Sequence, residues 1–280
     1  MITNILTATN HNRDIFSSKY IYPVISRRAG GLSLGINLNT NNACNWQCIY
    51  CEVPNLVRGK PEPINLNLLN NELDYWLEEI VNGSFLNQYT NQRTEFKDIA
   101  FSGNGEPTAT KEFESVVKIV ISKVNKFNLA KKIKIRLITN GSYLYTQRVQ
   151  HGLALLNELD REIWFKIDQV DETQSLIINQ INISKENLKN NLKNALRASP
   201  TVIQTCLFKI NQKLPEEKLL QTYIKFLKPY ELEVKAIHLY SLARPSEQSS
   251  NLILERLSLP EIEAIADKIK TLNTPIYCYV

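Results

Sequence analysis

Residues 33–52, SLGINLNTNNACNWQCIYCE, decide the fold, because a short apolar run leads directly into three cysteines. Short apolar runs that end at polar residues are typical of buried strands. Similar runs follow at 98–102, 133–138, 163–167, 202–208 and 234–240. Between them, apolar residues recur every three or four positions, which predicts helices. These helices are expected at 66–81, 113–127, 143–159, 184–198, 215–227 and 260–272.

Six strand–helix repeats predict an α/β fold with a parallel sheet and helices outside it. Because a closed barrel of this kind has eight strands, we expect a partial (β/α)6 TIM-like barrel. A single domain is expected over residues 1–280. Within it, residues 1–32 form an N-terminal extension packing on the barrel, 33–245 the barrel core, and 246–280 a C-terminal helix and tail. Functional groups of such folds gather where the strands end.

The composition is that of an ordinary globular protein, with 43% hydrophobic residues and a net charge of +5. This charge permits an anionic partner such as RNA without demanding one. No apolar run approaches the roughly 20 residues that cross a bilayer. Residues 1–16 also lack the continuous apolar stretch of a secretion signal. We therefore expect a cytoplasmic protein without a membrane partner.

Three of the five cysteines, Cys44, Cys48 and Cys51, have the spacing C-x3-C-x2-C just after the first predicted strand. Such crowding is a poor disulfide framework and in a reducing compartment indicates metal binding or catalysis. Three thiolates can bind three irons of a 4Fe–4S cluster and leave one iron open. That iron could accept the amino and carboxylate groups of S-adenosylmethionine (SAM). Reductive cleavage of SAM would then give methionine and a 5′-deoxyadenosyl radical.

Other functions remain open at this point. Structural zinc prefers four protein ligands, and no fourth ligand is near in sequence, but a three-ligand catalytic zinc site is compatible with the spacing. A glycyl-radical activating enzyme needs only one cluster and a protein partner. A non-catalytic Fe–S or zinc protein on a barrel scaffold would have no reason to bind SAM. A basic RNA-binding module would need an exposed aromatic and cationic surface.

The cysteine spacing, with an aromatic residue at position 50, resembles the signature of the radical SAM superfamily. SGNGEPT at 102–108, after the second predicted strand, resembles the family's GGEP motif with one inserted residue. The structural alternative is a turn before a helix. The resemblance implies catalysis at the cluster-binding cysteines and assigns the remaining candidates to SAM: Tyr50 and Tyr240 to adenine, Gly103, Asn104, Gly105 and Glu106 to the methionyl amino group, and Asn140 and Ser142 to the ribose or carboxylate.

Further polar residues lie at later strand ends. Lys166 and Asp168 flank Ile167, and strand alternation sends both to one face. They form either a buried ion pair or a catalytic or SAM-carboxylate contact through Lys166. On the next strand, Gln204 and Thr205 are weaker candidates, and the alternative is that their side chains satisfy each other in the core. Cys206 on the same strand is expected to be a core residue. Arg244 faces either an anionic substrate or solvent.

YPVISRRAGGLSLGIN at 22–37, GNGEP, KID at 166–168 and LARP at 242–245 resemble the wyosine-type tRNA-modifying branch. That resemblance implies a tRNA base as substrate and an electron donor such as flavodoxin or ferredoxin. Arg27 and Arg28 would contact phosphate or seal the barrel bottom through salt bridges. The branch carries a second cluster on three N-terminal cysteines, whereas no cysteine precedes Cys44 here. We therefore expect one cluster, and the sequence leaves the substrate, the reductant, the fate of SAM and the oligomeric state open.

Overall fold

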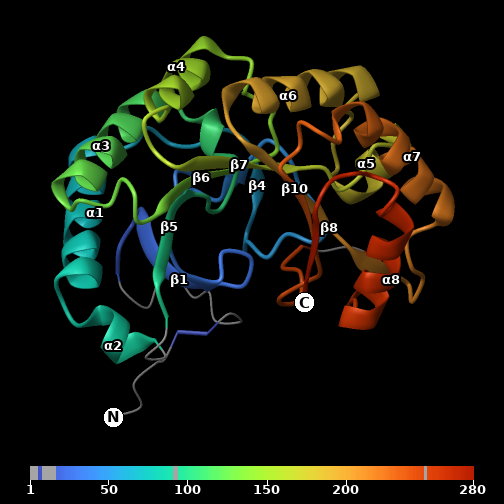
Figure 1. Ribbon diagram of the computed structural model, residues 1–280, viewed down its shortest axis with the longest axis horizontal. Coiled ribbons are helices and arrows are strands. Elements are labelled where there is room, and N and C mark those ends of the chain that lie inside the picture. The colour runs from blue at the N-terminus through green and yellow to red at the C-terminus, as the bar shows by residue number, and fades with distance from the viewer. Residues whose placement is uncertain (1–5, 8–16, 91–93, 249–250) are drawn as a thin grey trace.

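The computed structural model describes residues 6–7, 17–90, 94–248 and 251–280. Its centre is an eight-stranded sheet in the order β1-β2-β5-β6-β7-β8-β10-β12. The sheet curls into an open half-barrel with the longer helices around its convex side (Figure 1). The strands are β1 (Ile21–Ser26), β2 (Gly31–Ile36), β5 (Phe96–Phe101), β6 (Lys134–Thr139), β7 (Arg161–Lys166), β8 (Thr201–Cys206), β10 (Ala236–Tyr240) and β12 (Ile276–Tyr279).

The strands from β2 to β12 pair in parallel, whereas β1 pairs antiparallel with β2. Two small pairs lie outside the sheet: β3 (Ala43–Cys44) with β4 (Val57–Arg58), and β9 (Phe208–Ile210) with β11 (Leu254–Arg256). The helices are α1 (Leu66–Val81), α2 (Phe85–Tyr89), α3 (Phe113–Lys126), α4 (Gln147–Leu155), α5 (Glu172–Ile178), α6 (Lys185–Ala198), α7 (Glu217–Leu227) and α8 (Leu259–Ile269). Short 3-10 turns occupy Pro107–Ala109 and Lys228–Tyr230.

The predicted α/β half-barrel is confirmed, and each of the six predicted strands is present with shifted ends. Two edge strands were not predicted. β1 lies within the segment expected to precede the first strand, and β12 lies within the expected tail. Pro23 in β1 is compatible with its place at the sheet edge, where a missing backbone donor is tolerated.

Helix ends follow local capping chemistry. The Ser184 side chain accepts a hydrogen bond from the Asn187 backbone and caps α6. Pro260 lies in the first turn of α8, where its missing N–H is not needed. Pro215 precedes α7, whose N-cap is Glu216.

Strand alternation gives the half-barrel two different faces. The outward side chains, such as Leu34, Phe101 and Phe165, are buried with the apolar sides of the helices in the main core. On the concave face, Ser33 is hydrogen-bonded to Asp98. The convex face of the sheet therefore packs in the apolar core, whereas the concave face carries polar side chains. Among the described residues, no helix has the length and apolar character to span a membrane.

Candidate active site

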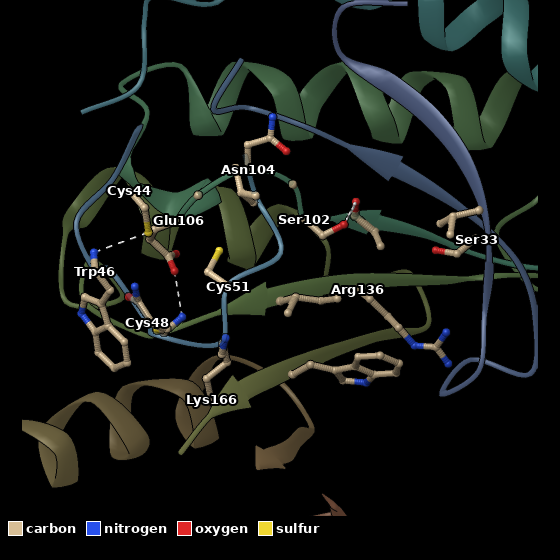
Figure 2. Close-up of a pocket in the computed structure, with 18 of the residues that line it drawn as sticks. Ser33, Cys44, Trp46, Cys48, Cys51, Ser102, Asn104, Glu106, Arg136 and Lys166 are labelled. Atoms are coloured by element: carbon tan, nitrogen blue, oxygen red, sulfur yellow. Dashed lines mark hydrogen bonds between the residues drawn. The ribbon is translucent and has the colours of Figure 1, made fainter. Parts of the chain in front are cut away.

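A cavity of about 270 Å³ opens on the concave face of the half-barrel. Figure 2 shows the thiols of Cys44, Cys48 and Cys51 towards one end and Ser33 and Arg136 towards the other. Ten of the predicted site residues line this cavity: Cys44, Cys48, Tyr50, Cys51, Gly103, Asn104, Gly105, Glu106, Asn140 and Lys166. The structure thus gathers residues from four separate sequence segments into one site.

The cysteine loop follows β2 and is held by short-range contacts. The Trp46 backbone N–H donates to Cys44 Sγ at 3.5 Å, and the Cys51 N–H donates to the Cys48 carbonyl at 2.9 Å. None of the three cysteines forms a disulfide. Burial raises the pKa of Cys44 and raises the pKa of Cys48 to about 12. Without a bound metal the Cys44 and Cys48 thiols are therefore protonated at neutral pH, and metal binding would release their protons.

Asparagine side chains join the cysteine loop to the loop after β5. Asn37 Oδ1 accepts the Asn104 backbone N–H at 3.0 Å, and Asn104 Nδ2 donates to Asn42 Oδ1 at 2.6 Å. A Cβ on Gly105 would lie 2.2 Å from the Ala43 carbonyl oxygen, so only glycine fits this approach. Asn104 and Gly105 therefore hold the two loops together, a role that sequence reasoning missed.

Glu106 is 2% exposed, and both of its carboxylate oxygens accept hydrogen bonds from neighbouring residues. Its Oε1 accepts hydrogen bonds from the Thr108 backbone and hydroxyl and, at 2.6 Å, from the Thr139 hydroxyl. Its Oε2 accepts the Asn140 N–H at 2.7 Å. Burial raises the pKa of this carboxyl, and the four donors oppose the shift. Because Oε2 takes a single donor, it retains acceptor capacity for a ligand.

Asn140 also reaches the cysteine loop. Its Nδ2 donates to Asn45 Oδ1 at 3.0 Å, and its Oδ1 accepts the Ser142 N–H at 3.0 Å. Asn45 lies between the first two cysteines. The Asn140 side chain thereby links the end of β6 to the cysteine loop, and its backbone N–H links the same residue to Glu106 in the loop after β5.

Lys166 and Asp168 do not form an ion pair with each other in the described part of the chain. The Lys166 ammonium lies 4.9 Å from the centre of the Tyr50 ring. Burial lowers the pKa of Lys166, but attraction to Tyr240, Asp168 and other groups outweighs burial and raises it, so the amine stays protonated. Asp168 instead accepts hydrogen bonds from the Tyr50 hydroxyl, Asn179 Nδ2 at 2.8 Å and the Cys206 N–H at 3.0 Å.

Ser142 and Tyr240 are predicted site residues that do not line the cavity. The Arg244 side chain is partly exposed and pairs with a carboxylate of the cysteine loop. Its guanidinium binds Glu52 Oε2 at 2.6 and 3.0 Å, beside the last cysteine of the loop. Arg244 therefore anchors the cysteine loop to the segment after β10, a contact that the sequence did not predict.

Gln204 and Thr205 do not satisfy each other, so the alternative interpretation of this pair was wrong. Thr205 Oγ1 donates to the Ile167 carbonyl at 2.8 Å and contacts the Tyr223 hydroxyl at 2.8 Å. Gln204 makes its hydrogen bonds on the concave face, to Arg28 and His238. Cys206 is 3% exposed, as expected of a core residue.

The donors of the cysteine loop fit a soft metal centre. Three thiols from one loop open towards a single cavity, and sulfur ligands are those that iron–sulfur clusters and zinc select. Cys48 Sγ also accepts a hydrogen bond from Asn179 Nδ2 at 3.2 Å, a contact of the kind that tunes a metal-bound thiolate. Among the described residues, no three His, Cys, Asp or Glu side chains converge closely enough to bind one metal ion.

No family model matches the chain. A UPF0026 protein of Helicobacter pylori is 28% identical over 80% of this chain and 66% of its own length. A UPF0026 protein of Methanocaldococcus jannaschii is 26% identical over 90% of this chain and 70% of its own length. A protein named GTPase Obg from Brachyspira hyodysenteriae is 31% identical over 54% of this chain, but this chain spans only 20% of its length.

Solved structures with the same fold include a radical SAM methyltransferase. A radical SAM methyltransferase from Sphaerobacter thermophilus superposes with a TM-score of 0.61 at 12% identity, over 95% of this chain and 71% of its own. The anSMEcpe protein with bound AdoMet gives 0.56 at 15% identity, over 86% and 62% of the two chains. HydG, the FeFe-hydrogenase maturase of Carboxydothermus hydrogenoformans, gives 0.52 at 13% identity, over 87% and 52%. The chain therefore has the partial TIM-barrel fold of radical SAM enzymes.

Proposed function

We propose that this chain is a radical SAM enzyme that holds a 4Fe–4S cluster on Cys44, Cys48 and Cys51. One observation carries the proposal: the three cysteines of a C-x3-C-x2-C loop, none of them in a disulfide, line the same cavity as the GNGE segment and Asn140. When bound and reduced, the cluster would supply the electron that cleaves SAM to start hydrogen abstraction. The fold shared with radical SAM enzymes supports this function.

The chain's own residues would bind and orient SAM around the thiols. Glu106 Oε2 has acceptor capacity directed into the cavity and would bind the ammonium group of SAM by a charge-assisted hydrogen bond. Lys166 lines the same cavity with its charge unpaired by any described carboxylate and would bind the SAM carboxylate. The backbone near Tyr50 and Tyr240 would contact adenine, and Ser142 the ribose or carboxylate.

The wider assignment rests on the resemblance to the wyosine-type branch. It makes a tRNA base the first substrate to test and flavodoxin or ferredoxin the first electron donors, in the cytoplasm. The net charge of +5 is compatible with an RNA substrate.

The ligand set is tested by iron and sulfide analysis after anaerobic reconstitution. We expect about four irons and four sulfides per chain, and loss of the intact cluster when Cys44, Cys48 or Cys51 is replaced by Ala. Cys206→Ala is a matched control, because Cys206 is a buried thiol in the same apolar cluster as the loop cysteines. Zinc in place of iron, or cluster loss in Cys206→Ala alone, would contradict the proposed ligand set.

A further inference from the structure

The cavity extends beyond the residues assigned to SAM, towards a second group of charged side chains. Besides the cysteine loop, its lining includes Arg28, Asp98, Arg136 and Trp164. Arg28 lies in the turn between β1 and β2, and its neighbour Ala29 packs with Trp164 against the concave face. The turn from the sheet edge thus crosses into the half-barrel and brings a guanidinium into the cavity.

Neighbouring carboxylates neutralise the charge of Arg136. It pairs with Asp98 and, at 3.3 Å, with Glu162, and its guanidinium is 4.7 Å from the centre of the Trp164 ring. Glu162 is shared with Lys134 and Lys235. Arg136 therefore belongs to a compensated ion-pair network and has little net charge to offer a ligand.

Arg28 has a different environment. Its guanidinium lies 4.4 Å from the centre of the Tyr240 ring and 5.3 Å from that of Trp164, and its NH1 donates to Gln204 Oε1 at 2.6 Å. No described carboxylate pairs with it. A guanidinium has five N–H donors, and stacking on rings leaves the edge donors free for a planar or tetrahedral oxyanion.

Two buried side chains, Gln204 and His238, fix the orientation of Arg28 through hydrogen bonds. Gln204 is 0% exposed and contacts His238 Nδ1 through Nε2 at 3.0 Å. Because that nitrogen takes the amide donor, Oε1 of Gln204 points towards Arg28. Burial and the nearby Arg28 lower the pKa of His238 to about 4, so the ring is neutral and can accept this hydrogen bond at neutral pH. An amide in this place holds the arginine without neutralising it, as a carboxylate would.

We propose that Arg28 forms an oxyanion-binding subsite of this cavity, which takes a carboxylate or phosphate group of the substrate. Neither carboxylate of the cavity pairs with Arg28: Asp98 pairs with Arg136, and Glu106 accepts hydrogen bonds from Thr108, Thr139 and Asn140 and is assigned to the SAM ammonium group. Among the described lining residues, Arg28 and Lys166 are the cations without a carboxylate partner, and Arg28 is the one that remains once Lys166 is assigned to the SAM carboxylate. The cavity therefore favours an anionic substrate. This inference deepens the proposed function and rests on it only in treating the bound anion as a substrate.

The test uses saturation-transfer NMR on the cluster-loaded chain with acetate and methylphosphonate, and with acetamide as the neutral match for acetate. We expect the anions to bind at least about tenfold more tightly than acetamide, since hydrogen bonds to charged groups contribute about 1.5–3 kcal/mol. The anion that binds more tightly identifies the oxyanion class. Binding of acetamide as tight as that of both anions would overturn the proposal.

Two variants locate the binding. Arg28→Gln should weaken anion binding about tenfold or more, and Gln204→Glu should do the same while keeping the stacked arginine, because the new carboxylate neutralises it. Arg197→Gln, at an exposed arginine of α6, should bind as the unmodified chain does. Undiminished binding in Gln204→Glu overturns the subsite even if Arg28→Gln fails to fold. Because no step uses SAM cleavage, anion binding without cleavage would refute the proposed function alone, and cleavage without anion binding would refute the subsite alone.

Discussion

The Asn140 backbone N–H donates to Glu106 Oε2 at 2.7 Å, which joins the end of β6 to the loop after β5. The side chain of Asn140 also donates a hydrogen bond, to Asn45 within the cysteine loop. Glu106 therefore has two roles that the sequence motif does not separate. It fixes the relative positions of neighbouring strand ends, and it presents one oxygen to the cavity.

Replacing Glu106 by Gln separates these roles from iron binding. We expect SAM affinity to fall about tenfold or more, because a charge-assisted hydrogen bond contributes about 1.5–3 kcal/mol. The new NH2 group would also face buried donors and lower stability by about 1–3 kcal/mol. Thr139→Val removes one donor and keeps the carboxylate, so it should retain SAM binding. Equilibrium dialysis with labelled SAM and iron analysis measure both effects; unchanged SAM affinity in Glu106→Gln would exclude the ammonium contact.

Asp168 should matter for stability rather than as a partner of Lys166. Its carboxylate collects donors from Tyr50, Asn179 and the Cys206 backbone. Asp168→Asn should lower the free energy of unfolding by about 1–3 kcal/mol, because a buried amide cannot accept all of these bonds. The exposed Asp267→Asn should stay within about 0.5 kcal/mol. Urea unfolding measures the free energy of unfolding of both variants. Equal values would show that the hydrogen bonds to Asp168 do not stabilise the fold.

His238 predicts acid sensitivity with a defined sign. Its pKa is lowered from 6.5 to about 4 by burial and nearby arginines, so the unfolded chain binds more protons than the folded chain between these values. Stability is then complete above pH 6.5 and falls as the pH drops towards 4, by up to about 3 kcal/mol. His238→Gln should flatten this slope, whereas replacing the exposed His151 should not. The free energy of unfolding, measured from pH 4 to 7, tests this prediction. An unchanged pH dependence in His238→Gln would refute its assignment to His238.

The sequence predicted the repeating units of the fold because their signals are local. Each predicted strand is a short apolar run, and helix α1 (Leu66–Val81) was predicted with its observed ends. β1 was missed because Pro23 interrupts its pattern, and β12 because it has only 4 residues. Pairing at a sheet edge depends on distant partners that periodicity does not report.

The candidate site was predicted in part for the same reason. Clustered cysteines and the GNGEP segment are local motifs, whereas the contacts that assemble them are not. Arg28 and Gln204 are 176 positions apart, and Asn37 and Asn104 are 67 apart. The asparagines of the cysteine loop carried no recognisable spacing, so their positioning role became visible only in the folded chain.

Formation of 5′-deoxyadenosine from SAM by the anaerobically reconstituted, reduced chain tests the central claim most directly. We predict product from the unmodified chain and from Cys206→Ala, and none from Cys48→Ala. Reductant alone and flavodoxin should be compared, each with and without tRNA, because some cleavage requires bound substrate. No product under any of these conditions from a fully loaded cluster would contradict the account, as would product that persists in Cys48→Ala.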